Sequence, residues 1–137
     1  MKRSIAALCV LILAVLAAKI WAGPVEEVAQ IGGPRLKALQ EGDVDAYTAA
    51  FADNAVLDSS LSAFRIEGKE AVQAYFTELF QTYPRRGVFV RQQAMRAYND
   101  DFVISNSYAV FSVTDQQGKV TPLQVRSSVA WAKLGGR

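Results

Sequence analysis

The protein has 137 residues, of which 51% are hydrophobic and 20% charged, as is typical of one globular domain and not of a disordered chain. It contains no histidine and a single cysteine, Cys9, which excludes a Ser-His-Asp triad, an internal disulfide and a zinc site of histidine and cysteine ligands. Without Lys2, Arg3 and Lys19, the 15 basic residues fall to 12 against 13 acidic ones, a net charge of about −1. The composition therefore does not predict nucleic-acid binding.

The first 22 residues have the pattern of a secretion signal. Lys2 and Arg3 precede an apolar run at residues 5–18, and the small Ala22 offers a cleavage site. A membrane anchor is the alternative, but the run is shorter than the roughly 20 residues that span a bilayer. We expect a cleaved signal peptide at residues 1–22 and export to the periplasm or the extracellular space, with membrane contact only through this segment.

Two helical segments are predicted next. Apolar residues recur at spacings of three to five across residues 25–40, but the Gly-Gly-Pro sequence at residues 32–34 interrupts them, so we expect two short helices or a kinked one. Gly42 suits the left-handed end of this segment, and Asp43 suits the N-cap of a second helix that carries Tyr47.

The middle of the chain predicts two short strands and the most regular helix. Residues 55–58 and 64–67 are the short strands. Apolar and aromatic side chains then recur every three or four positions over residues 69–83, and Pro84 ends the pattern. The apolar face of this helix consists of Val72, Tyr75, Phe76, Leu79, Phe80 and Tyr83.

After residue 86 the pattern changes to β structure. Three stretches at residues 88–98, 102–114 and 120–133 are rich in β-branched and aromatic residues, and short polar turns separate them. Such short connections produce antiparallel neighbours. Helices followed by a meander indicate an α+β fold, with one curved antiparallel sheet and the helices packed on one face.

Three segments carry a resemblance to a known family. LQEGDVDA at residues 39–46, FADNAVL at 51–57 and IEGKEAVQAYF at 66–76 resemble the nuclear transport factor 2-like superfamily, and within it the small bacterial SnoaL-like and SgcJ/EcaC-type proteins. The resemblance implies a cone-shaped fold for residues 23–137, with a pocket at its wide end and a homodimer formed through the convex side of the sheet. Enzymes, binding modules and assembly domains share this scaffold, so the fold alone predicts no reaction.

A narrower resemblance concerns the exported iota-class carbonic anhydrases. VLDSSLS at residues 56–62, together with Tyr75, is similar to their metal-free site, in which a threonine stands at the position of Ser60. The resemblance implies that Ser60 and Tyr75 position water and CO₂. In that family the glycine turn near residue 135 leads into a last strand that supplies another hydroxyl, so we expect a C-terminally truncated domain whose last strand is missing.

The same resemblance implies ligand-binding positions on the strands, because NSY at residues 106–108 and VR at 125–126 are similar to the matching strands of that group. We expect Arg126 to point into the cone and to bind a carboxylate or bicarbonate, with Ser128 on the same strand face. The alternative is that Arg126 points outward as a solvated charge. The candidate ligand-binding residues are Arg126, Ser128, Tyr47, Phe76, Leu79 and Tyr108.

Asp58 is the candidate general acid or base. A carboxyl at the rim of an apolar cavity would have its neutral form favoured, which raises its pKa. The alternative is a surface aspartate at the end of a strand.

Three functions follow, and the sequence leaves open whether the protein is an enzyme. The first is an exported small-ligand pocket protein that hydrates CO₂ without a metal, a lyase reaction at Ser60 and Tyr75. The second is a non-catalytic dimeric domain that binds a ligand or a partner, and the third is an isomerase- or cyclase-like proton transfer at Asp58. No nucleotide, flavin or metal motif is present, so we expect no cofactor; the expected partners are a small molecule and a second copy of the chain.

Overall fold

The computed structural model describes residues 23–135, and the predicted signal peptide at residues 1–22 lies outside this range. The helices are α2 (Pro24–Glu41), α3 (Val44–Thr48) and α4 (Lys69–Thr82), and the strands are β1 (Val56–Leu57), β2 (Ile66–Glu67), β3 (Arg85–Asn99), β4 (Phe102–Thr114) and β5 (Val120–Ala132). Over residues 23–135, no helix is long and apolar enough to cross a membrane.

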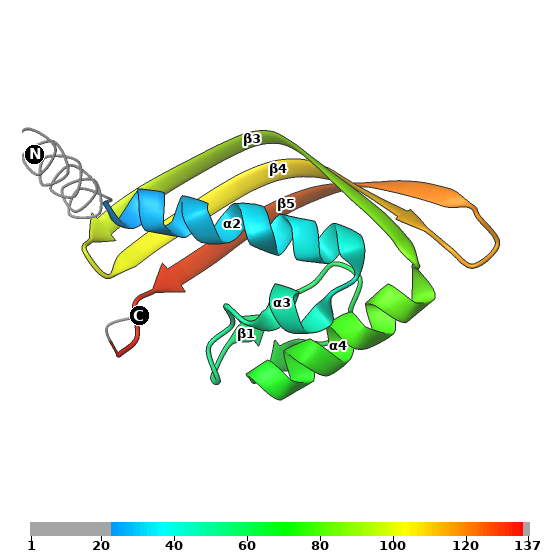
Figure 1. Ribbon diagram of the computed structural model, residues 1–137, viewed down its shortest axis with the longest axis horizontal. Helices are drawn as coiled ribbons and strands as arrows, with labels where there is room; N and C mark the ends of the chain where they lie inside the picture. The colour runs from blue at the N-terminus through cyan, green and yellow to red at the C-terminus, as the bar shows by residue number, and fades with distance from the viewer. Residues whose placement is uncertain (1–22, 136–137) are drawn as a thin grey trace, which may run out of the picture.

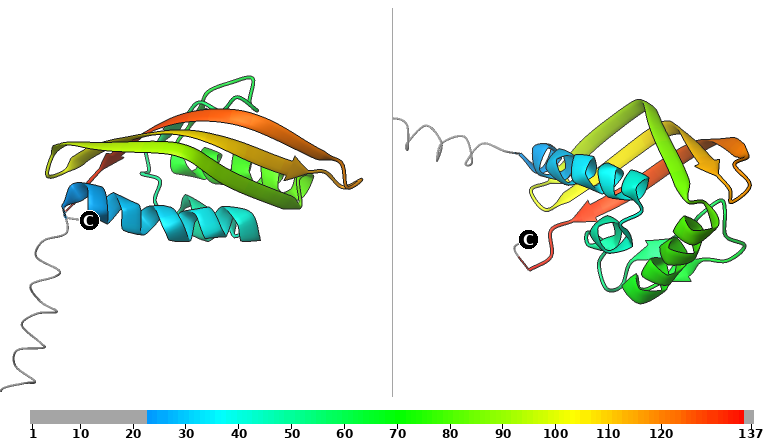
Figure 2. Two further views of the ribbon diagram at one scale, coloured as in Figure 1. Left: turned by 90° about the horizontal axis from the view of Figure 1, so that it is seen from above. Right: turned by 45° about the vertical axis from the view of Figure 1, so that its right-hand side comes forward.

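The three long strands form one antiparallel sheet in the order β3-β4-β5, and β1 and β2 pair as a separate small antiparallel sheet. The long sheet is strongly bent (Figures 1 and 2), and α2 lies along its concave side. Helices α3 and α4 lie next to each other on the same, concave side of the sheet (Figure 1). The expected α+β cone, with helices on one face of a curved sheet, is therefore confirmed.

Side chains alternate along the strands, so each strand presents every second residue to the helices. On β4 the buried Val103 and Val113 belong to this inner face. The register between β3 and β4 shifts between Val90 and Gln92, which is a β-bulge. Because the bulge inserts one residue, Val90 before it and Gln93 after it both face the helices.

Helix α2 is a single helix through Pro34, so the expectation of two pieces is wrong. Proline removes one backbone donor and disfavours a helical residue before it, but the preceding Gly33 has no Cβ to clash with the proline ring. Burial of Val28 and Leu39 on either side of Pro34 stabilises the continuous helix through tertiary packing. The helix ends at Gly42, whose φ of 82° and N–H bond to the Ala38 carbonyl form a left-handed cap.

The main core lies where α2, α4 and the first part of the sheet meet. Leu39, Val72, Phe76 and Phe80 are its buried residues. The chain enters β3 beside this core, where the Arg86 guanidinium donates to the carbonyls of three residues at the ends of α2 and α4. These acceptors are Leu39 at 2.9 Å, Phe80 at 3.1 Å and Tyr83.

Candidate functional site

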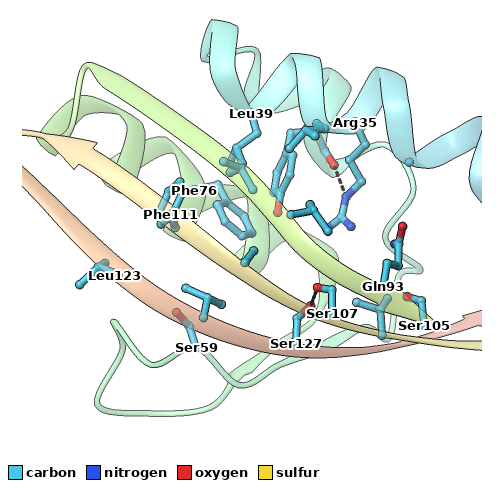
Figure 3. A pocket seen from close by; sticks show the side chains of 18 of the residues that line it. Arg35, Leu39, Ser59, Phe76, Gln93, Ser105, Ser107, Phe111, Leu123 and Ser127 are labelled. Carbon is cyan, nitrogen blue, oxygen red and sulfur yellow. Dashed lines mark hydrogen bonds between the residues drawn. The ribbon is translucent and has the colours of Figure 1, made fainter. Parts of the chain in front are cut away.

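The concave side of the sheet and the helices line a half-open cavity of about 530 Å³. Residues from α2, α3, α4, the loop after β1 and all three long strands line it (Figure 3). Most of the wall is apolar, including Leu36, Leu39, Phe76, Leu79, Phe111 and Leu123. Of the candidate ligand-binding residues, Tyr47, Phe76 and Leu79 line this cavity.

A row of neutral polar side chains crosses the sheet floor of the cavity. Gln93, Ser105, Ser107 and Ser127 come from β3, β4 and β5 and lie on the inner face of the sheet (Figure 3). Ser107 and Ser127 share a hydrogen bond of 2.7 Å between their Oγ atoms, and Ser105 Oγ accepts one from Trp131 Nε1 at 3.0 Å. Each of the three serines thus has one side-chain hydrogen bond within the sheet, and the Gln93 amide has none among the described residues.

A second hydroxyl pair lies in the wall beside α4. Tyr75 Oη and Ser59 Oγ are 2.7 Å apart, and both residues line the cavity together with Ser60. Ser59 Oγ also accepts from the Leu61 N–H at 3.2 Å, which fixes its direction in the turn. The structure thus places Ser60 and Tyr75 in the lining of the same cavity. The hydrogen-bond partner of Tyr75 is Ser59 and not Ser60, the serine that the family resemblance indicated.

Arg35 of α2 is the charged residue of the cavity, and no other described lining residue carries a charge. Its Nε donates to the Tyr47 carbonyl at 3.3 Å, which joins α2 to α3. Its Cζ lies 4.5 Å from the ring centroid of Tyr47, 4.8 Å from that of Phe51 and 5.7 Å from that of Trp131. These distances are within the range of cation–π contacts. Burial raises the pKa of the Tyr47 hydroxyl, and the charge of Arg35 partly opposes this effect.

The prediction that Arg126, Ser128 and Tyr108 face the pocket is wrong. Because strand side chains alternate, the inward positions of Val125 and Ser127 place Arg126 and Ser128 on the outer face of the sheet. There Arg126 lies over the ring of Tyr108 with its Cζ 5.5 Å from the centroid. Ser128 Oγ donates to Asn106 Oδ1 at 2.7 Å on the same face.

Asp58 does not have the environment that was expected of a general acid. Its carboxylate accepts two hydrogen bonds from Arg65, at 2.9 Å from Nε and 3.0 Å from Nη2. The hydrogen bond from Arg65 lowers the pKa of Asp58, whereas burial would have raised it. The residue is exposed and does not line the cavity, so it is a surface ion pair at the end of β1.

Within residues 23–135, no group of three or more carboxylate, thiol or imidazole side chains is arranged to hold a metal ion. The side-chain functional groups that line the cavity are hydroxyls, the Gln93 amide, the Met95 thioether, the Trp131 indole and the Arg35 guanidinium, against a mainly apolar wall.

Solved structures with the same fold come from several bacteria. A Xanthomonas campestris protein, provisionally assigned as a calcium/calmodulin dependent protein kinase II association domain, is 23% identical, with a TM-score of 0.74 over 84% of this chain and 81% of that one. A nuclear transport factor 2-like superfamily protein from Salmonella enterica is 16% identical, with a TM-score of 0.71 over 80% of each chain. A Catenulispora acidiphila protein in complex with S-DNPA is 22% identical, with a TM-score of 0.65 over 89% and 84%.

The TM-scores show that this chain shares the fold of these structures, and at such low identity they show the fold alone. The predicted nuclear transport factor 2-like fold is thereby confirmed. A comparison with curated proteins finds no match. The model of one protein family, described as the calcium/calmodulin dependent protein kinase II association domain, matches residues 25–137. This match spans almost the whole chain after the predicted signal, and the chain therefore belongs to the calcium/calmodulin dependent protein kinase II association domain family.

Proposed function

We propose that the protein binds a small, largely apolar organic molecule in the cavity between α2 and the sheet. The observation that carries the proposal is the size and character of this cavity, about 530 Å³ with a mainly apolar wall. Small-molecule sites in proteins have volumes of roughly 300–1,000 Å³ and combine such walls with a few polar groups. The neighbour solved in complex with S-DNPA adds support, because it shares this fold.

The cavity also has a physical reason to take up such a ligand. Phe76, Phe111 and Leu123 expose part of their apolar surface to it. Covering that surface removes it from water and contributes about 25 cal/mol for each Å² buried. A ligand with an apolar body therefore gains free energy that a polar metabolite of the same size does not.

Filling the cavity with a tryptophan tests this proposal. The probe is N-phenylnaphthylamine, an uncharged fluorophore that brightens when it enters an apolar site. Val125 of β5 lines the cavity, so Val125→Trp is expected to weaken binding about tenfold or more because the new side chain occupies the ligand volume. Saturable fluorescence enhancement measures the affinity.

The matched control is Gln124→Trp, which adds the same side chain one position away on the outer face of β5. It is expected to leave the affinity unchanged. Equal loss in both variants, or no loss in Val125→Trp, would place the probe outside the cavity and contradict the proposal.

Metal-free CO₂ hydration stays a prediction, and the Ser59–Tyr75 hydroxyl pair is the feature that favours it. The size of the cavity argues for a ligand larger than CO₂ as the main occupant. A stopped-flow assay decides between them: hydration above the buffer rate that Tyr75→Phe abolishes supports the reaction, and the buffer rate alone removes it. Proton transfer by Asp58 has no support from the position of that residue.

Self-association through the outer face of the sheet is a second candidate function, which the family description favours. Phe89 and Tyr108 lie on that face and are 68% and 51% exposed. We propose that a second copy of the chain covers them.

Phe89→Glu is expected to convert a dimer to a monomer in sedimentation velocity, because the proposed interface would have to bury the new charge. Val56→Glu introduces the same charge at an exposed position on β1 and is expected to leave the dimer intact. A monomeric wild-type protein would contradict the proposal.

A further inference from the structure

We infer that the ligand of the cavity is an organic carboxylate with an apolar body, and that its carboxylate binds Arg35. This inference rests on the proposed function, since it names the chemical class of the molecule that occupies the same site. Arg35 is not among the residues that the sequence patterns single out.

The charge of Arg35 is unmatched within the described part of the protein. None of the lining residues is acidic, and no described carboxylate lies within ion-pair distance of its guanidinium. Only Nε has a hydrogen-bond acceptor among residues 23–135, the Tyr47 carbonyl at 3.3 Å. Nη1 and Nη2 therefore have N–H donors available at the cavity.

The surroundings of Arg35 hold the guanidinium in one place. The rings of Tyr47 and Phe51 lie 4.5 and 4.8 Å from its Cζ, and Trp131 of β5 lies against it at 5.7 Å. Aromatic rings stabilise the cation without supplying an opposing charge. A fixed, planar guanidinium with free donors matches the two oxygens of a carboxylate.

The polarity of the cavity also sets the direction in which such a ligand lies. Arg35 points from α2 toward the sheet, and the neutral Ser107 and Ser127 lie on the sheet opposite it (Figure 3). Those two hydroxyls bond to each other and carry no charge. An anionic group thus gains most at Arg35, and the apolar body of the ligand fills the space between α2 and the sheet.

One guanidinium in a mainly apolar wall favours a single negative charge over a double one. A phosphate monoester carries between one and two negative charges near neutral pH, and burying charge without a partner is costly. A carboxylate carries one charge, which Arg35 neutralises. The apolar lining then favours a ring or a branched chain next to the carboxyl group.

Isothermal titration calorimetry with two isosteric probes tests the inference. Naphthoate carries the carboxylate, and naphthamide replaces it with a neutral amide of almost the same shape. We expect the wild-type protein to bind naphthoate about ten to a hundred times more tightly, as charge-assisted hydrogen bonds in a partly buried site predict.

Arg35→Met keeps most of the apolar stem and removes the charge. It is expected to abolish the preference for naphthoate while changing the naphthamide affinity less than about threefold. Arg35→Lys keeps the charge without the planar fork and is expected to retain part of the preference. Arg126→Met, which removes the same charge on the outer face of the sheet, is the matched control and should keep the full preference.

The two proposals fail in distinguishable ways. If wild-type protein binds naphthamide as tightly as naphthoate, the carboxylate inference is wrong and the apolar pocket stands. If neither probe binds, the proposed function fails and the inference fails with it. Tighter binding of naphthyl phosphate than of naphthoate would overturn the carboxylate assignment. These wild-type comparisons decide the matter even if Arg35→Met does not fold.

Discussion

Replacing Phe76 with alanine is expected to lower the free energy of unfolding by about 3–5 kcal/mol. Phe76 is 7% exposed and lies at the centre of the aromatic cluster between α3 and α4. Its ring meets Tyr47 edge to face at a centroid distance of 4.6 Å, and Tyr75 in the same way at 5.1 Å. Truncation to alanine removes the apolar surface that Phe76 buries, its contacts with the two rings, and part of the cavity wall.

Urea denaturation monitored by circular dichroism measures this loss. The control is Phe64→Ala, which makes the same chemical change at a ring that is 83% exposed in the loop before β2. It is expected to change the unfolding free energy by less than about 0.5 kcal/mol. Similar losses in the two variants would show that the cluster around Phe76 is not the core described here.

Replacing Arg86 with methionine is expected to cost about 2–4 kcal/mol, because three backbone carbonyls lose their donor. The guanidinium bonds to the carbonyls of Leu39, Phe80 and Tyr83, and its Cζ lies 4.2 Å from the centroid of the Phe80 ring. It thus joins the ends of α2 and α4 to the start of β3. Burial lowers the pKa of Arg86, yet an arginine stays charged throughout the physiological range.

Arg85→Met is the matched control, since the neighbouring side chain is exposed and has no hydrogen bond to the described residues. It is expected to leave the unfolding free energy within about 0.5 kcal/mol of the wild type. If the two variants lose equal stability, the carbonyl bonds of Arg86 do not stabilise the fold as described.

The local signals of the sequence predicted most of the elements. The period of the apolar residues located α4, and polar turns separated the three strands of the long sheet. The exception was α2, where Pro34 was expected to break the helix. Packing of Leu39 and its neighbours on the sheet outweighs the lost hydrogen bond, and such packing depends on residues far away in the sequence.

The facing of Arg126 could have been predicted from β5 itself. Apolar residues recur there at Leu123, Val125, Val129 and Trp131, and this alternation places the even-numbered residues on the opposite face. The family resemblance instead implied that Arg126 points into the cavity, and the apolar alternation along β5 is the better guide to its direction. For Gln93 no comparable signal exists, because the β-bulge that turns it inward is not visible in the sequence.

Arg35 had no signal in the sequence that marks it as a site residue. It follows the Gly-Gly-Pro interruption of α2, and its ring contacts come from α3, from the turn after it and from the far end of β5. For Ser59 the sequence did indicate the right segment, since Ser59 and Ser60 are adjacent. Which of the two serines points toward Tyr75 depends on the geometry of the turn, and the sequence does not show this geometry.

A crystal structure of the protein with naphthoate tests the central claim most directly, because it shows where a carboxylate with an apolar body binds. We predict the naphthalene ring between α2 and the sheet, with the carboxylate oxygens within hydrogen-bond distance of Arg35 Nη1 and Nη2. Naphthoate bound on the outer face of the sheet, or a cavity closed by its own side chains while the probe stays in solution, would contradict the account.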